Sequence, residues 1–278
     1  MVVELHCHST CSDGSVAPEE VARRAADRGV ELFCLTDHDT MAGHPRTAAA
    51  LAEGPARVLC GLELSCHDAD RTIHLLVYGV REGAGKEALE RLLEDVIRRR
   101  RERLEAIVDR LAALGITLDA AAILEQSRDH TPGRPDVARA LLAAGAVQSL
   151  REAFDRFLHD GGPADVPIAR LTLAEGLEFG RACGARMSLA HPHTLRSYPI
   201  VGALFRRHKS AGLEGIEAYY GRYGAAERLH WSRLADELGL VITGGSDFHG
   251  EALPEVTRPG ISMPAPLARR LVDWLEPS

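Results

Sequence analysis

The first 80 residues alternate between short apolar runs and amphipathic stretches. Val2, Val3 and Leu5 predict a strand at the N-terminus. A helical pattern begins at Pro18 and stops at Gly29, and a second helix is expected over 43–54. Strands are expected over 30–36, 56–64 and 73–78. This order of elements predicts an α/β fold whose strands run parallel.

The pattern changes after residue 83. Apolar residues recur at helical spacing from Leu89 to Leu114, which predicts a long helical segment. The run Arg98–Arg103 within it holds five arginines and one glutamate. We interpret this run as a solvated helix face rather than a phosphate-binding patch. Further helices are expected over 134–144 and 150–158, and residues 84–165 are predicted to be a helical insertion or subdomain.

Alternation resumes after Gly161-Gly162-Pro163, so that residues 1–83 and 166–278 are predicted to form one domain around the insertion. Helices are expected over 173–183, 202–212, 225–238 and 266–275. Strands are expected over 186–190, 215–219 and 240–243.

The composition is that of a globular protein with ample core. The chain has 278 residues, of which 45% are hydrophobic and 26% are charged. No apolar run approaches the roughly 20 residues of a membrane span, and no secretory signal is visible. The six cysteines show no Cys-x-x-Cys spacing, so we expect reduced thiols in a cytoplasmic protein. The net charge of -7 argues against broad nucleic-acid affinity.

Histidines and carboxylates gather at or just beyond the predicted strand ends. They are His6, His8, His38, Glu63, His191, Asp247 and His249, with Asp13 close by and His74 near a strand start. The carboxyl ends of strands form the active face of parallel α/β proteins, so these residues are expected to meet there. Any one of these histidines could be structural, but the whole set favours a site for zinc, manganese or iron.

The chain resembles a known family in its sequence motifs. His6-x-His8, Ser12-Asp13-Gly14, Thr36-Asp37-His38-Asp39-Thr40, Gly61-x-Glu63, Ile73-His74, Ala190-His191-Pro192 and Gly245-Ser246-Asp247-x-His249 are similar, in order, to the motifs of the PHP (polymerase and histidinol phosphatase) family. The resemblance implies a distorted, TIM-like (β/α) barrel of seven strands that binds three divalent ions. Mn²⁺ is the expected metal, with Fe²⁺ and Zn²⁺ as alternatives.

The resemblance also implies how the ligands are divided. One ion would be held by His6, His8, Glu63 and Asp247, a second by Glu63, His74 and His191, and a third by Asp13, His38 and His249. Three such ions bring about +6 and the three carboxylates about -3, so the site would attract phosphate. A water molecule between the ions would be acidified and would attack the phosphoryl group. Glu4, Asp37 and Asp39 are expected to orient ligands.

The insertion narrows the expected substrate. Gly133-Arg134-Pro135-Asp136, Ala153-Phe154-Asp155-Arg156 and Gly161-Gly162-Pro163 resemble the bacterial nucleoside 3′,5′-bisphosphate phosphatase branch. The resemblance implies that Arg134 binds a substrate phosphate, although a surface role at a helix start is an equal alternative. This branch usually has histidine at the position of Asp136 and Gly-Arg-Tyr where this chain has His193-Thr194-Leu195. Asp136 would then need a partner such as Arg139, and His193 could bind phosphate, protonate the leaving group or be a loop residue.

The sequence therefore predicts a metal-dependent phosphoesterase for a small phosphorylated metabolite, with a nucleoside 3′,5′-bisphosphate as the expected substrate. The alternatives are a histidinol-phosphate phosphatase, a 5′–3′ exoribonuclease on short RNA, an amide-hydrolysing metalloenzyme and a non-catalytic metal-binding module. No membrane or obligate protein partner is expected. Tyr219, Tyr220 and Tyr223 are interpreted as packing residues rather than as part of the site.

Overall fold

The computed structural model describes residues 1–128 and 130–276, which divide into two compact units. The first unit is Met1–Arg91 together with the chain from Arg170 onward, and the second is Leu92–Ala169. Each unit is described separately below. Among the described residues, no helix is both long and apolar enough to cross a membrane.

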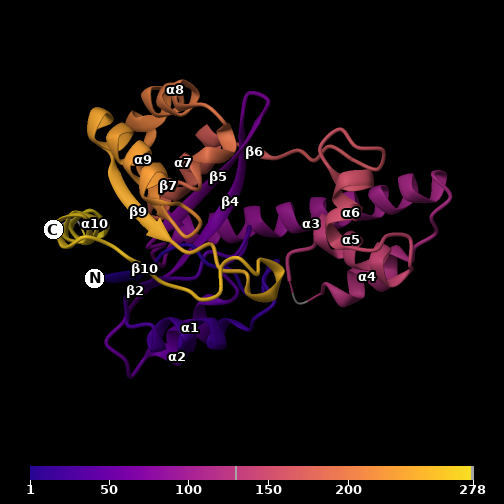
Figure 1. Ribbon diagram of the computed structural model, residues 1–278, viewed down its shortest axis with the longest axis horizontal. Coiled ribbons are helices and arrows are strands. Elements are labelled where there is room, and N and C mark those ends of the chain that lie inside the picture. Colours follow the sequence, from indigo (N-terminus) through magenta and orange to yellow (C-terminus); the bar gives the residue numbers. More distant parts are fainter. Residues whose placement is uncertain (129, 277–278) are drawn as a thin grey trace. The chain divides into compact units, whose positions relative to one another are not determined.

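All of the strands found in the described residues belong to the first unit (Figure 1). They are β1 (Val2–Glu4), β2 (Val30–Cys34), β3 (Arg57–Leu59), β4 (Gly61–Asp68), β5 (Arg71–Tyr78), β6 (Leu171–Thr172), β7 (Arg186–Leu189), β8 (Leu213–Tyr220), β9 (Val241–Gly245) and β10 (Ile261–Ser262). Its helices are α1 (Pro18–Asp27), α2 (His44–Leu51), α7 (Leu173–Ala182), α8 (Tyr198–His208), α9 (Ala225–Leu238) and α10 (Ala265–Leu275), with short 3₁₀ turns η2 (Pro192–Leu195), η3 (Lys209–Ala211) and η4 (Gly250–Ala252). This is an α/β fold, as expected.

The strands form two sheets, which two isolated β-bridges connect. One sheet has the order β10-β1-β2-β3 and the other β6-β4-β5-β7-β8-β9. A parallel bridge between Cys7 and Phe248 joins the segments that follow β1 and β9. A second parallel bridge pairs His38, after β2, with Glu63 in β4. The segments that carry the predicted ligands are therefore hydrogen-bonded to one another.

Two strands run against the expected parallel direction, and one of them is β10, which pairs antiparallel with β1. β5 runs antiparallel to both β4 and β7. Only Ala69 and Asp70 separate β4 from β5, whereas a parallel crossover needs a dozen or more residues. The expected strand 56–64 is also divided at Cys60 into β3 and β4, which belong to different sheets. The expectation that the strands all run parallel was therefore wrong for β5 and β10.

Most helices of the first unit lie where the apolar pattern placed them. α1 begins with Pro18, carries Glu19 and Glu20 in its first turn, and buries Val21 and Ala22. α8 starts at Tyr198 rather than at residue 202, because Pro199 occupies its first turn. The short strands β6 and β10 were not predicted, since two residues give no periodic signal.

The second unit is helical. It contains most of α3 (Ala84–Ala113), α4 (Ala120–Gln126), α5 (Arg134–Ala143), α6 (Leu150–Ala153) and a π-helical turn η1 (Phe154–Leu158). Leu104, Ile107 and Leu111 of α3 pack with residues of α4 and α5 to form its core. α4 was not predicted. Arg98 pairs with Asp95 and Glu102 along the exposed helix surface, in agreement with a solvated face.

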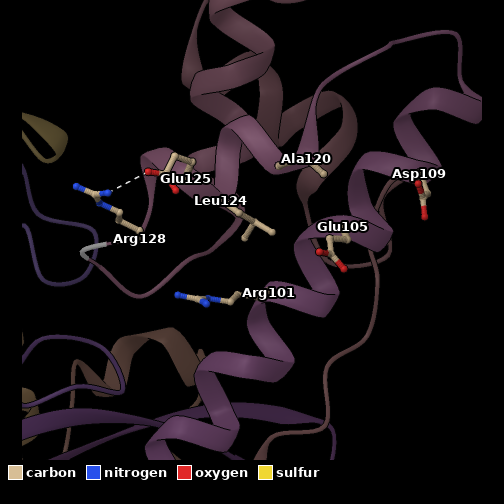
Figure 2. Close-up of a pocket in the computed structure, with 8 residues that line it drawn as sticks. Arg101, Glu105, Asp109, Ala120, Leu124, Glu125 and Arg128 are labelled. Carbon is tan, nitrogen blue, oxygen red and sulfur yellow. Dashed lines mark hydrogen bonds and ion pairs between the residues drawn. The ribbon is translucent and has the colours of Figure 1, made fainter.

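A shallow hollow of about 580 Å³ lies between α3 and α4 in this unit (Figure 2). Arg101 and Glu105 of α3 and Leu124 of α4 line it, and a 3.1 Å ion pair joins Glu125 to Arg128 at its edge. The lining carries both signs of charge and includes none of the predicted site residues.

Candidate metal centre

The nine predicted ligands are brought together in the first unit, and Glu63 lies at the middle of them. Its Oε1 is 2.9 Å from His74 Nδ1 and 3.1 Å from His191 Nε2. Its Oε2 is 3.2 Å from His8 Nε2 and 3.3 Å from His6 Nε2, and 3.1 Å from His38 Nδ1. Glu63 is 1% exposed, so one buried carboxylate faces five imidazoles.

The remaining predicted ligands, Asp13, Asp247 and His249, lie next to this group. Asp247 Oδ1 is 3.3 Å from Nε2 of both His6 and His8. Asp13 Oδ1 is 3.3 Å from His249 Nε2, and its Oδ2 is 3.7 Å from His38 Nε2. The rings of His8 and His249 stack with their centroids 4.0 Å apart. All nine residues therefore form one continuous polar cluster.

Four overlapping groups within the cluster have ligand atoms close enough to share one ion. They are His6, His8 and Asp247; His6, Glu63 and His191; His38, Glu63 and His74; and His8, Asp13, His38 and His249. These groups overlap with the three ligand sets expected from the sequence without reproducing them residue for residue.

The hydrogen bonds of His6 and His8 indicate whether a cation can bind between these rings and the carboxylates that face them. Nε2 of each ring is buried and makes no hydrogen bond to the described part of the chain. The Glu217 carboxylate accepts from His6 Nδ1 over 2.9 Å, so the neutral His6 ring carries its lone pair on Nε2. That lone pair faces carboxylate oxygens at 3.3 Å, an arrangement that favours a cation between them. The donor set fits divalent metal ions.

The pKa shifts of the clustered side chains show how protons and metal ions would compete for the same atoms. Burial would lower the pKa of His8, but the neighbouring carboxylates of Asp247, Glu63 and Asp13 raise that pKa to about 10. Burial lowers the pKa of His38 to about 4. Burial alone would raise the pKa of the Glu63 carboxyl, but the surrounding imidazoles hold it well below its ordinary value. A metal ion that binds these atoms has to displace protons.

Three residues of the cluster or next to it have left-handed backbone angles. Asp247, His191 and Asp39 have φ values of 57°, 26° and 52°. Such angles are costly for residues other than glycine and gather at functional sites. Each is held by a hydrogen bond from its own amide: Asp247 to the His6 carbonyl, His191 to the Glu217 carboxylate, and Asp39 to the Glu63 carbonyl.

The three expected orienting residues make hydrogen bonds that fix the ligand segments. Glu4 is buried and accepts from the amides of His6, Ser246 and Gly260. Asp37 accepts from the amide and hydroxyl of Ser9 and from the Ser12 hydroxyl. Asp39 accepts from the amide of Ser65 over 2.7 Å. Burial raises the pKa of both Glu4 and Asp37.

Two residues that touch the ligands were missed from the sequence. Glu217 is fully buried in β8 and binds both the His6 ring and the His191 amide, at 2.9 and 2.7 Å. Tyr220 donates its hydroxyl to Asp247 Oδ2 over 2.7 Å, so its interpretation as a packing residue was wrong. A glutamate between the apolar residues Ile216 and Ala218 of a strand was the signal that could have identified Glu217.

His193 lies beside this cluster in η2. Its ring centroid is 6.1 Å from that of His191 and 5.4 Å from that of Tyr220. The Tyr223 hydroxyl contacts both its amide and its Nδ1, at 3.2 and 2.8 Å, so Tyr223 too is more than a packing residue.

Arg134 and Asp136 lie in the second unit at the start of α5. Arg134 donates to the Leu158 carbonyl and to Asp160, over 2.8 and 2.7 Å. Asp136 pairs with Arg139 at 2.6 Å, as expected, and also with His130 at 2.8 Å. Both residues are therefore engaged by protein groups of their own unit.

The geometry defines a class first: an α/β protein with a buried histidine–carboxylate centre suited to divalent metal ions. Comparison with known proteins identifies the family within this class. Residues 4–125 match the model of the PHP domain. The chain is 33% identical to the phosphoribosyl 1,2-cyclic phosphate 1,2-diphosphodiesterase of Eggerthella lenta, over 95% of this chain and 100% of that protein. It belongs to the PHP family.

Two further relatives come from Chromobacterium violaceum. The chain is 30% identical to a 3′,5′-nucleoside bisphosphate phosphatase, over 92% of this chain and 94% of that protein. It is also similar to a solved structure of an amidohydrolase with bound sulfate, at 30% identity and a TM-score of 0.84, which covers 97% of this chain and 95% of the other.

Proposed function

We propose that this protein is a metal-dependent phosphoesterase whose centre holds three divalent ions. The observation that carries the proposal is the Glu63 carboxylate, which directs one oxygen to His74 and His191 and the other to His6, His8 and His38. A buried carboxylate with imidazoles on both oxygens is suited to bridge two metal ions. The family relationship supports the same conclusion.

The ligand assignment follows the division expected from the sequence. His6, His8, Glu63 and Asp247 would hold one ion; Glu63, His74 and His191 a second; and Asp13, His38 and His249 the third. Mn²⁺ is the proposed metal, and Fe²⁺ and Zn²⁺ suit the same nitrogen and oxygen donors. When bound, these ions would supply an acidified water molecule as nucleophile and would neutralise charge on the phosphoryl group.

Other side chains of the protein would orient the metal ligands and bind the substrate. Glu217 holds the His6 ring with Nε2 directed inward, and Tyr220 holds one oxygen of Asp247 so that the other faces the histidines. His193 is proposed to contact the substrate beside His191. Arg134 is proposed to bind a second phosphate, for which it would exchange its bond to Asp160.

A closed barrel is the architecture that we propose for the first unit. The sheet order, together with the bridges Cys7–Phe248 and His38–Glu63, links β1, β2, β4, β5, β7, β8 and β9 in a continuous ring of neighbours. This supports the distorted seven-stranded arrangement expected from the sequence. The insertion at residues 84–165 is proposed to contribute to substrate binding.

The proposed substrate is a nucleoside 3′,5′-bisphosphate, as the name of one C. violaceum relative suggests. A second candidate is a cyclic phosphodiester of a phosphorylated ribose, because the E. lenta relative is 33% identical over its whole length. Both are small phosphorylated ribose derivatives, so the same metal chemistry serves either. A short RNA and histidinol phosphate remain the alternatives from the sequence.

A turnover screen with Mn²⁺-loaded protein tests the proposal. The substrates are adenosine 3′,5′-bisphosphate, phosphoribosyl 1,2-cyclic phosphate, a short 5′-phosphorylated RNA, histidinol phosphate and p-nitrophenyl phosphate. We expect the highest kcat/KM with the bisphosphate. A preference for the cyclic ester or for RNA would change the substrate but keep the reaction class. Absence of turnover on all five, in protein shown to contain metal, would contradict phosphoesterase activity.

A further inference from the structure

A tight turn follows β8 beside the candidate centre, and Arg222 lies in this turn. The Tyr223 amide donates to the Tyr220 carbonyl over 3.0 Å, so Gly221 and Arg222 are the two central residues of a β-turn. Gly221 fits closely against the residue that precedes a predicted ligand, because a Cβ at this position would clash with the Ser246 carbonyl. The turn is therefore packed directly against a segment of the centre.

The two tyrosines that flank Arg222 are held by polar groups of the centre or beside it. Tyr220 is 2% exposed and donates its hydroxyl to Asp247 Oδ2 over 2.7 Å. Tyr223 is 5% exposed, and its hydroxyl is 2.8 Å from His193 Nδ1. The centroids of the two tyrosine rings are 4.9 Å apart. A side chain between such anchors has a fixed backbone, so binding a ligand there costs little ordering of the chain.

The Arg222 side chain is exposed, and in the described part of the chain its guanidinium has no hydrogen-bond or ion-pair partner. Glu227, the first carboxylate after the turn, accepts instead from the Gly224 amide over 3.2 Å. The charge of Arg222 acts on the side chains beside the centre, since burial, His191 and Arg222 all lower the pKa of His193. A cation without a protein partner is thus available at this place.

We propose that Arg222 binds a second phosphoryl group of the substrate, the one that is not hydrolysed. A guanidinium offers paired N–H donors that match phosphate oxygens, and it stays charged. The reacting group belongs at the metal ligands around Glu63, whereas Arg222 adjoins the centre only through its neighbours Tyr220 and Tyr223. The inference rests on the proposed phosphoesterase function, and both proposed ribose substrates carry such a second group.

Arg134 is proposed for the same kind of contact, but it starts from a different state. Its guanidinium already donates to the Leu158 carbonyl and to Asp160. Arg134 would give up a protein contact on binding phosphate, whereas Arg222 has none to give up in the described part of the chain. Arg222 should therefore contribute more to the affinity for the second phosphoryl group.

Calorimetry tests this contact without any turnover. The full chain, loaded with Mn²⁺, is titrated with phosphonate analogues of adenosine 3′,5′-bisphosphate and of adenosine 3′-monophosphate, which resist hydrolysis. Arg222→Met should weaken binding of the bisphosphate analogue by roughly 10-fold or more, because a hydrogen bond to a charged group is lost. Binding of the monophosphate analogue should stay within about twofold, since that analogue has no second group for Arg222 to bind. The Arg222 side chain is exposed, so the variant should fold as the wild type does.

Arg270→Met is the matched control, because it removes the same charge from an exposed position on α10. Trp274 of that helix binds Glu214, which lies at the other end of β8 from the turn. The control should bind both analogues within about twofold of the wild type. An equal loss of both analogues in Arg222→Met would overturn the proposal, as would unchanged binding of the bisphosphate analogue. A loss in Arg134→Met with none in Arg222→Met would overturn it too.

Turnover tests the proposed function separately from this contact. Arg222→Met should raise KM for adenosine 3′,5′-bisphosphate by about 10-fold or more, and should leave KM for p-nitrophenyl phosphate, which has a single phosphoryl group, unchanged. An equal rise for both substrates would contradict the role of Arg222 at the second group. If the wild-type protein hydrolyses neither substrate, the proposed function fails, and calorimetry still decides whether Arg222 recognises a second phosphoryl group.

Discussion

Replacing Glu217 by glutamine tests whether the candidate centre depends on this buried carboxylate. Glu217 is fully buried and accepts two hydrogen bonds, from His6 Nδ1 at 2.9 Å and from the His191 amide at 2.7 Å. Glutamine has nearly the same volume but only one acceptor oxygen. The fixed backbone amide of His191 should take that oxygen, which leaves the new NH₂ group opposite the His6 ring.

The expected consequence is a change of tautomer at His6. Its Nδ1 would have to accept from the NH₂ group, so the ring proton would move to Nε2, the atom that faces Glu63 and Asp247. Loss of one hydrogen bond to a charged group costs about 1.5–3 kcal/mol, and changes around metal-binding histidines typically weaken metal affinity by roughly 10- to 100-fold. We expect a loss within this range for Glu217→Gln.

Competition of the protein with a chelating dye for Mn²⁺ measures this change, and circular dichroism checks the fold. Glu214→Gln is the matched control, because Glu214 lies on the same strand but binds Trp274 and Arg186 away from the centre. It should leave metal affinity within about twofold, since a partly exposed ion pair contributes little. If Glu217→Gln also stays within twofold, the reasoning about the His6 tautomer is refuted.

Three further variants probe other parts of the structure. Gly245→Ala should abolish metal binding and lower Tm, because the added Cβ would come within 2.3 Å of His6 Cβ and meet its backbone. Tyr220→Phe should weaken metal affinity by about 10-fold, less than Asp247→Asn, because only the second oxygen of Asp247 loses a partner. Asp136→Asn should lower stability by about 1–3 kcal/mol at pH 7. Burial would raise the pKa of Asp136, but its hydrogen bonds hold that pKa below its ordinary value. The stabilisation is therefore present at neutral pH and lost as the pH falls below about 4, where thermal unfolding of wild type and variant should converge.

Each of these variants has a control in the same chain. Gly224→Ala adds a Cβ that would meet nothing within 4 Å, so it should bind metal normally. Tyr219→Phe removes a hydroxyl from the same strand as Tyr220. Asp155→Asn removes a carboxylate that forms a solvent-exposed ion pair with Arg151 and should show no comparable pH-dependent difference. Equal effects of a variant and its control would contradict the reasoning for that variant.

The sequence predicted which segments come together in the cluster, because two local signals coincide there. Each of His38, Glu63, His191 and Asp247 follows or lies near an apolar run, and strand ends on one face of an α/β fold meet in space. The direction of β5 was missed, although the two-residue connection from β4 already required an antiparallel pair.

The residues that orient the ligands were harder to predict. Glu217 is 211 positions from His6 along the chain, and Tyr220 is 27 positions from Asp247. Their contacts arise from the order of neighbouring strands, which the periodicity of a single strand does not contain. Tyr223 and His193 likewise meet only because the loops after β8 and β7 are adjacent.

Anomalous X-ray scattering from crystals of the full chain soaked in Mn²⁺ tests the central claim most directly. The account predicts three anomalous peaks: one against His6, His8 and Asp247, one against His74 and His191, and one against Asp13, His38 and His249, with Glu63 between the first two. Absence of peaks at these residues in crystals that contain Mn²⁺, or peaks only elsewhere on the molecule, would contradict it.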